Sequence, residues 1–261
     1  MAVRDNHRLW PGGQLLYRLD FDTTSNTYVK DVVESAMKQI NAVGCVAIEV
    51  ASASATDYIS VQLGNDYSSY MGRQGGPQNM TVVAKTINRG TVMHELMHSL
   101  GLGHEHNRPD RDEYVTVDFD NIQDAAKPYF TKYTPNDPLE EDHLEYDYTS
   151  LMHATNVYDE EINIDIMKPV IWRNDGGIEL GQRSYLTELD QQRLKMIYSC
   201  DVCKSNQAGS LLFRYPGDCS RFIQCSNAQA YIMDCPQGLH FNNKKQICDY
   251  PDQAECTTQS A

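Results

Sequence analysis

Apolar positions in the N-terminal part of the chain follow two different periods. Between residues 28 and 43 they recur every three or four positions, which predicts an amphipathic helix. Short apolar runs predict strands at residues 15–21, 46–51, 58–63 and 81–84. A glycine-rich stretch from Gly72 to Gly76 predicts a turn between the last two of these strands.

Two more helices are predicted further along the chain, at residues 91–102 and 186–198. Thr187 and Asp190 are spaced as a capping box, in which each side chain binds the other residue's backbone amide. Residues 107–181, between these helices, are polar and rich in proline, which predicts loops. Because the helices do not alternate with strands one by one, the pattern predicts an α+β fold.

The chain has 261 residues and a formal net charge of −14. Such a negative surface disfavours nucleic acid and anionic membranes as partners. No apolar stretch approaches the ~18 residues of a membrane-spanning helix, so we expect no membrane partner. The start of the chain is polar, and we expect any signal peptide to be missing from this sequence. A monomer is the simplest expectation for the assembly.

The eight cysteines are distributed unevenly, with Cys45 and Cys200 in the first 200 residues and the others between residues 203 and 256. An even number and a dense cluster predict disulfides, and therefore a secreted, extracellular protein. Zinc binding by the cluster is the alternative. A zinc ribbon requires two close C-x-x-C pairs, whereas only Cys200 and Cys203 form one. The change in cysteine density predicts two domains, residues 1–200 and 201–261.

The segment between residues 94 and 104 has the spacing of a metal site. His94 and His98 are one helical turn apart, so both imidazoles can bind the same ion. Gly101 permits a sharp turn that brings His104 to the same point as a third ligand. Three nitrogen ligands leave one position open for water, which is typical of catalytic Zn2+. Glu95 is predicted to be the general base that takes a proton from this water.

Two alternatives compete with a working zinc site. The H-E-x-x-H pattern arises by chance, although a third histidine and a glycine at the turn reduce that chance. A protein that keeps the ligands but has lost its activity is the other alternative, and the presence of Glu95 argues against it. Met152 is predicted to form an apolar floor beneath the imidazoles, although a methionine taken alone is more often ordinary core.

These residues resemble the astacin family of metzincins. The resemblance is carried by residues 9–13, 90–112, 180–190 and 197–200, and it spans residues 1–200. It implies a two-lobed, zincin-like zinc endopeptidase that acts on protein or peptide substrates. It also implies a zymogen, whose propeptide we expect to be missing from this sequence. The family further implies that Glu105 anchors the mature amino terminus, that Cys45 pairs with Cys200, and that Arg183 selects an acidic residue in the S1′ pocket.

The sequence departs from the family pattern in two places. Ala154 stands where family members usually have a tyrosine that binds the metal and supports the oxyanion. Tyr148 or Tyr158 is expected to take this role, or turnover is weak, since a lost oxyanion donor costs ~10²–10³ in rate. Tyr67 and Thr86 occupy the positions of the family's second disulfide.

Residues 203–256 resemble a peritrophin-A type chitin-binding domain, a disulfide-rich β module of carbohydrate-binding module family 14. The resemblance implies three cysteine pairs, although spacing alone leaves 15 connectivities open: Cys203–Cys225, Cys219–Cys256 and Cys235–Cys248. Phe222 and Phe241 are predicted to form a small core. The candidates for stacking on the sugar rings of chitin or a related polysaccharide are Tyr215, Tyr231 and Tyr250. A purely structural or protein-binding tail is the alternative.

We therefore predict a secreted zinc-dependent endopeptidase that its C-terminal domain holds on chitin or a related polysaccharide. The alternative is a chitin-binding or matrix-binding protein with a catalytically impaired protease domain, and Ala154 is the feature that favours it. Asn79 begins an N-x-T sequence and is a candidate glycosylation site.

Overall fold

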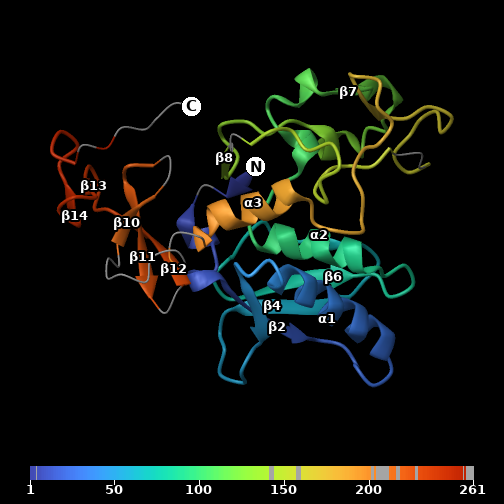
Figure 1. Ribbon diagram of the computed structural model, residues 1–261. Helices are drawn as coiled ribbons and strands as arrows, with labels where there is room; N and C mark the ends of the chain where they lie inside the picture. Colours follow the sequence, from blue (N-terminus) through green and yellow to red (C-terminus); the bar gives the residue numbers. More distant parts are fainter. Residues whose placement is uncertain are drawn as a thin grey trace.

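The N-terminal lobe is built around a five-stranded sheet (Figure 1). The computed structural model describes residues 1–3, 5–140, 144–156, 160–200, 203, 212–215, 218–226, 229–254 and 256. The sheet has the order β3–β2–β4–β6–β5, in which the edge strand β5 is antiparallel and the other pairings are parallel. Its strands are β2 (Gln14–Leu19), β3 (Ala47–Val50), β4 (Tyr58–Leu63), β5 (Ser68–Ser69) and β6 (Pro77–Val82).

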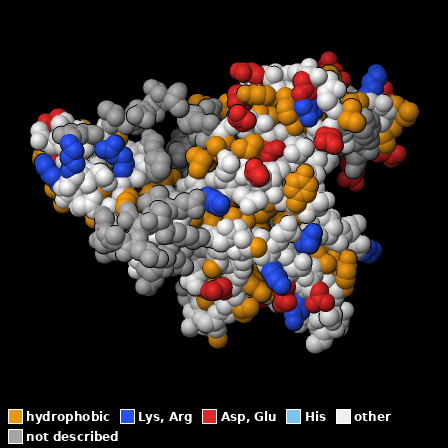
Figure 2. All heavy atoms as spheres, viewed as in Figure 1, with side chains coloured by type: hydrophobic (Ala, Val, Ile, Leu, Met, Phe, Trp, Pro, Cys, Tyr) orange, Lys and Arg blue, Asp and Glu red, His pale blue; other side chains and the backbone are white. Residues whose placement is uncertain are grey.

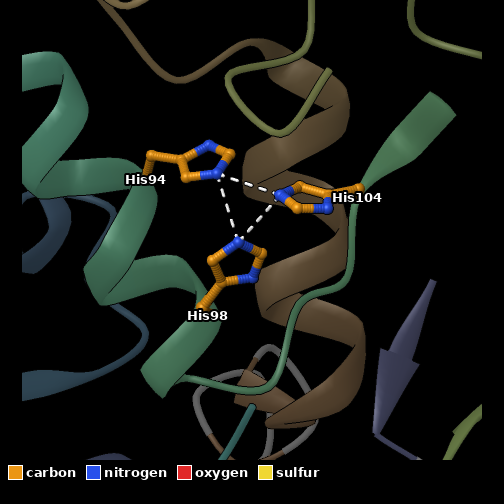
Figure 3. A group of neighbouring side chains, drawn as sticks. All are labelled: His94, His98 and His104. Atoms are coloured by element: carbon orange, nitrogen blue, oxygen red, sulfur yellow. Dashed lines mark hydrogen bonds between the residues drawn. The ribbon is translucent and has the colours of Figure 1, made fainter. Parts of the chain in front are cut away.

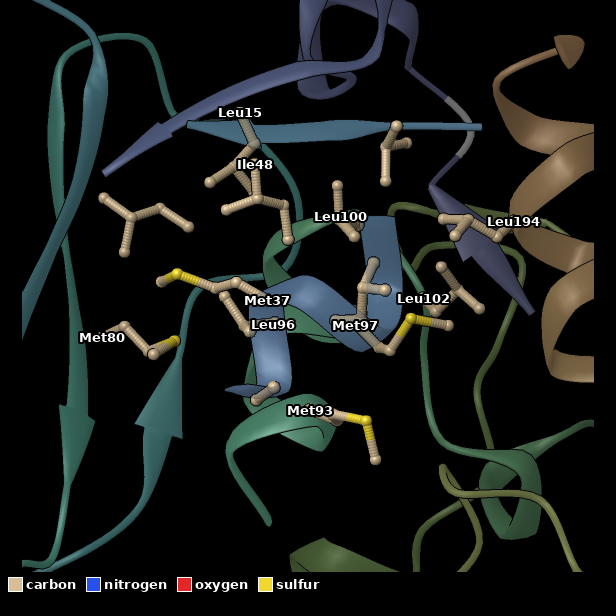
Figure 4. Close-up of a cluster of buried hydrophobic side chains, with 14 of the residues drawn as sticks. Leu15, Met37, Ile48, Met80, Met93, Leu96, Met97, Leu100, Leu102 and Leu194 are labelled. Carbon is tan, nitrogen blue, oxygen red and sulfur yellow. The ribbon is translucent and has the colours of Figure 1, made fainter. Parts of the chain in front are cut away.

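Helices α1 (Thr27–Asn41) and α2 (Arg89–Ser99) contact each other and the sheet. The helical period predicted for residues 28–43 is confirmed, because the apolar positions of α1 are its buried ones. Helix α2 is buried along nearly its whole length, so it has no polar face toward solvent. Figure 4 shows the core between these elements, to which the sheet, α1 and α2 contribute Leu15, Ile48, Met37, Leu96 and Met97.

The second lobe has little regular structure, as predicted for residues 107–181. Strand β7 (Val115–Val117) pairs with β9 (Ile171–Arg173), and β1 (Ala2–Val3) pairs with β8 (Leu139–Glu140). A separate apolar cluster lies inside this lobe and includes Ile122 and Phe130. Helix α3 (Glu188–Ile197) follows and packs Leu194 into the core of the first lobe. The 3-10 helices are η1 (Asn6–Arg8), η2 (Pro11–Gly13), η3 (Glu105–Asn107), η4 (Arg111–Glu113), η5 (Phe119–Asn121) and η6 (Lys127–Phe130).

Two element boundaries differ from the prediction by three residues or more. Strand β6 begins at Pro77, not at residue 81, because the glycine turn ends at Gly76 (φ +118°) and burial alternates from there to Val82. Helix α2 ends at Ser99, before the predicted residue 102, because Gly101 takes a left-handed conformation with φ +100°. The capping box of α3 is confirmed.

The C-terminal module, residues 203–256, is small, and the regular elements among its described residues are mainly strands. Strands β10 (Leu212–Arg214), β11 (Arg221–Ser226) and β12 (Gln229–Asp234) form an antiparallel sheet, and β13 (His240–Asn242) pairs with β14 (Ile247–Asp249). The predicted core pair is confirmed, since the rings of Phe222 and Phe241 stack with centroids 4.9 Å apart.

All eight cysteines form disulfides. The pairs are those that the family resemblances imply: Cys45–Cys200, Cys203–Cys225, Cys219–Cys256 and Cys235–Cys248. At the positions of the missing second disulfide, the hydroxyls of Tyr67 and Thr86 lie 3.2 Å apart, so a hydrogen bond replaces the covalent link. Among the described residues, no helix is both long and apolar enough to cross a bilayer.

Candidate metal centre and active site

Helix α2 positions three of the four predicted functional side chains. It begins at Asn88, whose side chain accepts a hydrogen bond of 2.9 Å from the Thr91 amide, as an N-cap residue does. His94 and His98 lie one turn apart on this helix, and their imidazoles point the same way (Figure 3). The N-cap therefore fixes where the helix starts, and the start of the helix sets the positions of the two histidines along it.

The turn after α2 brings the third histidine to the first two. Gly101 has φ +100°, and a Cβ atom there would lie 2.7 Å from the Val3 side chain, so a larger residue would be strained and crowded. The amino-terminal strand β1 supports this turn, because the Val3 amide donates to the Gly101 carbonyl and the Gly103 amide donates to the Met1 carbonyl. His104 follows directly and faces His94 and His98 (Figure 3).

The three Nε2 atoms of His94, His98 and His104 lie 3.0, 3.1 and 3.2 Å from one another. The Nδ1 of His94 donates to the Leu151 carbonyl at 2.9 Å, and the Nδ1 of His98 donates to the Leu102 carbonyl at 2.8 Å. The Nε2 atoms of these two rings therefore have lone pairs and no proton. Burial lowers the pKa of all three imidazoles, which keeps them neutral.

These observations fit a metal site. Unprotonated nitrogens that face one another repel unless a cation lies between them. Tetrahedral zinc with Zn–N bonds of about 2.05 Å separates its ligand nitrogens by about 3.3 Å, close to the spacing of these Nε2 atoms. The carbonyls that bind the two Nδ1–H groups fix the orientation of the rings, as the outer partners of metal-binding histidines usually do. The sequence-predicted ligands are thus brought together as a set that could hold a metal.

Glu95 lies next to the first ligand on α2 and is 6% exposed. Burial raises the pKa of its carboxyl to about 7, while the charge of Arg183 opposes this rise. A carboxyl with a pKa near neutrality can both accept and return a proton at physiological pH.

The Leu151 carbonyl joins α2 to two segments that are distant in sequence. It accepts a hydrogen bond from His94, and it also accepts one of 2.9 Å from Nη1 of Arg183. The same Nη1 donates to the His153 carbonyl at 3.0 Å, so Arg183 spans the turn that contains Met152. Met152 is 2% exposed and belongs to the core of the first lobe. Arg183 therefore contacts the same carbonyl that orients the His94 ring, a contact that the sequence pattern did not reveal.

Asp190 is a second residue whose role the sequence pattern missed. Its carboxylate completes the capping box of α3, but it also accepts hydrogen bonds from the Ser150 hydroxyl at 2.6 Å and the Leu151 amide at 2.9 Å. It thus ties the start of α3 to the turn whose Leu151 carbonyl binds the His94 ring. The only signal in the sequence is that aspartate stands where a capping box usually has the longer glutamate.

Glu105 is buried beside this turn, and two arginines share its carboxylate. Its Oε1 accepts hydrogen bonds from Arg193 at 2.8 Å, from Arg108 at 3.0 Å and from the Asp147 amide at 2.9 Å. Burial raises the pKa of Glu105, and the charges of Arg193, the amino-terminal group of Met1 and Arg108 oppose the rise. The charge of the amino terminus therefore acts on this carboxylate, and the anchoring role expected of Glu105 stays a prediction.

Comparison with known proteins agrees with this geometry. The family model for the astacin peptidases matches residues 2–199. The chain belongs to the astacin family. A second family model, that of the chitin binding peritrophin-A domain, matches residues 203–256, so this astacin chain has a further module at its C-terminal side.

Individual relatives of this astacin chain cover the same region. Zinc metalloproteinase nas-14 of Caenorhabditis elegans is 34% identical over 196 residues, which are 74% of this chain and 38% of the relative. Tolloid-like protein 1 of Mus musculus is 32% identical over 208 residues, which are 77% of this chain and 20% of the relative. The chain thus spans less than half the length of these curated relatives. The solved structure of high choriolytic enzyme 1, a hatching enzyme zinc-protease from Oryzias latipes, is 27% identical with a TM-score of 0.67, and the match covers 77% of this chain and 98% of that one.

The position of the expected astacin tyrosine is filled differently here. The Ala154 amide donates to Nδ1 of His106 at 2.9 Å, and its methyl group provides no hydroxyl. The hydroxyl of Tyr148, one of the two predicted substitutes, donates to the Tyr114 carbonyl at 3.4 Å. Tyr158, the other one, lies outside the described residues.

The three aromatic candidates of the astacin chain's module have different surroundings. Tyr250 is 67% exposed. Tyr215 is half-buried against the module's own core. The Tyr231 ring lies so close to Gly12 that a Cβ atom there would be 3.0 Å from it, so the hydroxyl end of the ring contacts protein. Asn79, the glycosylation candidate, is exposed on β6, and its side-chain oxygen accepts a hydrogen bond from Gln62 at 3.2 Å.

Replacing Arg193 by methionine should lower the free energy of unfolding by about 3–5 kcal/mol, because it leaves the buried Glu105 carboxylate short of one cation. Urea denaturation of the two proteins measures the difference. The matched control is Lys127→Met, which removes the exposed pair with Asp124 and should cost at most about 1 kcal/mol. Equal costs for both variants would contradict the role given to Arg193.

Proposed function

We propose that this chain is an extracellular zinc endopeptidase that its C-terminal module holds on chitin or a related polysaccharide. The observation that supports the proposal is the convergence of the Nε2 atoms of three imidazoles, with the buried Glu95 next to the first of these histidines on α2. Four disulfides support an extracellular location, where such bonds persist. Residues 1–200 would form the catalytic domain, and residues 201–261 the polysaccharide-binding domain.

His94, His98 and His104 would hold one Zn2+ ion. Bound by three nitrogens, zinc keeps an open position and acts as a Lewis acid toward water and a carbonyl oxygen. Glu95 would take a proton from the water that attacks the scissile carbonyl and would return it to the leaving amine, which its pKa of about 7 permits. The Leu151 and Leu102 carbonyls keep the rings oriented during these steps.

Two supporting residues complete the proposal for the catalytic domain. Met152 would form the apolar floor under the imidazoles, since it lies in the turn that Arg183 and Asp190 hold. Glu105 would anchor the amino terminus, whose charge acts on its carboxylate.

Asn79, which is exposed on β6, would be glycosylated. A mass shift that a deglycosylating enzyme removes tests this.

The rival function is a polysaccharide-binding protein with an impaired protease domain. Ala154 favours it, because the side chain at this position provides no hydroxyl for the oxyanion. The intact set of His94, His98, His104 and Glu95 favours the enzyme. The two functions differ in whether the zinc-loaded chain hydrolyses a protein such as casein.

Replacing Glu95 by glutamine should lower kcat/KM for casein or a peptide substrate by about 10²–10⁴-fold, because the amide cannot accept the proton. Zinc content, measured by elemental analysis, should remain one ion per chain, since Glu95 is not a ligand. The control is Glu113→Gln, an exposed glutamate of η4, which should retain full activity. If the wild-type chain loaded with zinc shows no hydrolysis that a chelator abolishes, the rival function is correct.

Arg183 would select an acidic residue directly after the cleaved bond. Its Nη1 is used by backbone carbonyls, while the remaining N–H groups of the guanidinium are suited to a carboxylate. Arg183→Gln should abolish the enrichment of Asp and Glu at this position in a peptide-library cleavage profile. Arg18→Gln, on β2, is the matched control and should leave the profile unchanged. No enrichment of acidic residues in the wild-type profile would refute this role.

Tyr250 would stack on a sugar ring of the polysaccharide, since it is the exposed candidate of the three. Tyr250→Ala should weaken retention on chitin about tenfold, because removing one stacked aromatic ring costs roughly 1–2 kcal/mol. Binding isotherms with chitin particles measure this. Tyr28→Ala removes an equally exposed ring from α1 and should have no effect. Unchanged retention of Tyr250→Ala would remove this residue from the binding surface.

A further inference from the structure

The covalent connection between the two domains is very short. Cys200 is bonded to Cys45 in the large domain, and Cys203 is bonded to Cys225 on β11 of the module. Two residues separate these anchored cysteines. Even fully extended, the chain between the Cα atoms of Cys200 and Cys203 spans at most about 11 Å. The module therefore cannot move far from the end of the large domain.

A specific contact lies next to this connection. Gly12, in η2, has φ +61°, and a Cβ atom there would lie 3.0 Å from the Tyr231 ring on β12, so the ring packs directly on the glycine backbone. The neighbouring Ile232 packs against the apolar core of the large domain. Figure 1 shows β12 as the strand of the module nearest the large domain. We call the contact of Tyr231 and Ile232 with the large domain the joint.

The joint is mostly apolar and not fully closed. A cavity of about 260 Å³ remains beside it, lined among others by Trp10, Tyr198 and Met233. The His7 imidazole, when protonated, forms an ion pair with Asp234 across the boundary at 4.0 Å, and both side chains are largely exposed. Exposed pairs of this kind contribute little, whereas the apolar contact partly removes the Tyr231 ring and the Ile232 side chain from water.

The opposite end of the module has the properties of an outward binding surface. Strands β13 and β14 lie on the side away from the large domain in Figure 1, and Tyr250 follows β14 directly. Figure 2 shows Lys and Arg side chains on this outer end, where Arg214 and Lys244 line a cavity of about 300 Å³. The side of the module at the joint and the side with Tyr250 are thus different.

We propose that Tyr231 and Ile232 dock the module on the large domain in one orientation, so that the surface with Tyr250 always faces away from the joint. Tyr231 then serves the contact between domains and not a sugar ring. The chain acts as one rigid body, and its candidate active site keeps a fixed position relative to the bound polysaccharide. This inference concerns the arrangement of the domains and does not depend on peptidase activity.

Because the connection is short, even a weak contact at the joint is enough to keep the module docked. Short linkers give an effective concentration in the millimolar range, so a joint with a dissociation constant below about 1 mM remains mostly formed. A longer, flexible connection would leave docking to the joint alone. Lengthening the connection therefore separates the contribution of the joint from that of the tether.

The test is small-angle X-ray scattering on four full-length proteins. The first is the wild type, and the second has ten Gly/Ser residues inserted between Cys200 and Cys203. The third and fourth combine this insertion with Tyr231→Ala or with Tyr250→Ala as the matched control. We expect the first, second and fourth to share one maximum dimension. The third should gain roughly 10–20 Å, because a ten-residue flexible linker spans about that distance.

A maximum dimension that grows with the insertion alone would overturn the proposal, because the joint would then not hold the module. Growth in both the Tyr231→Ala and Tyr250→Ala forms would do the same. Chitin retention of the single variant Tyr231→Ala is the second readout, and it should equal that of the wild type. If Tyr231→Ala loses retention on chitin while the third scattering protein keeps the wild-type maximum dimension, Tyr231 belongs to a sugar site and its docking role is refuted.

Discussion

The hydrogen bond from the His94 ring to the Leu151 carbonyl is the interaction on which the candidate site depends. It places the ring proton on Nδ1 and so leaves the Nε2 lone pair free for a metal. The same peptide group is held on both sides, since Arg183 donates to its carbonyl and Asp190 accepts from the Leu151 amide. Three segments that are far apart in sequence therefore define the position of one imidazole.

Two buried carboxylates, those of Asp190 and Glu105, stabilise this arrangement. Burying a charge is costly unless donors and cations surround it. The Asp190 carboxylate accepts hydrogen bonds from the Ser150 hydroxyl and from backbone amides. The Glu105 carboxylate accepts hydrogen bonds from two arginines and a backbone amide. Because a shift of its neighbours would leave each carboxylate unpaired, the turn that contains Leu151 and Met152 is held in one position.

The module shows how covalent and non-covalent constraints add. The disulfides at Cys200 and Cys203 limit the distance between the domains. The contacts of Tyr231 and Ile232 with the large domain determine the orientation of the module. Gly12 is necessary for this choice, because a side chain there would occupy the space of the Tyr231 ring. Tethering lets such a small contact have an effect that it would not have between separate molecules.

The sequence by itself determined the parts whose geometry is local. Two histidines one helical turn apart, a glycine at a positive φ and a capping box are fixed by backbone geometry within a few residues, so the candidate ligand set and helix α3 were predictable. The cysteine pairs followed from the resemblance to known families. Only the tertiary structure decided that Arg183 and Asp190 hold the turn that contacts His94, and that the Tyr231 ring contacts protein. These contacts join residues that are distant in the chain, and no periodicity or spacing encodes which distant surfaces will meet.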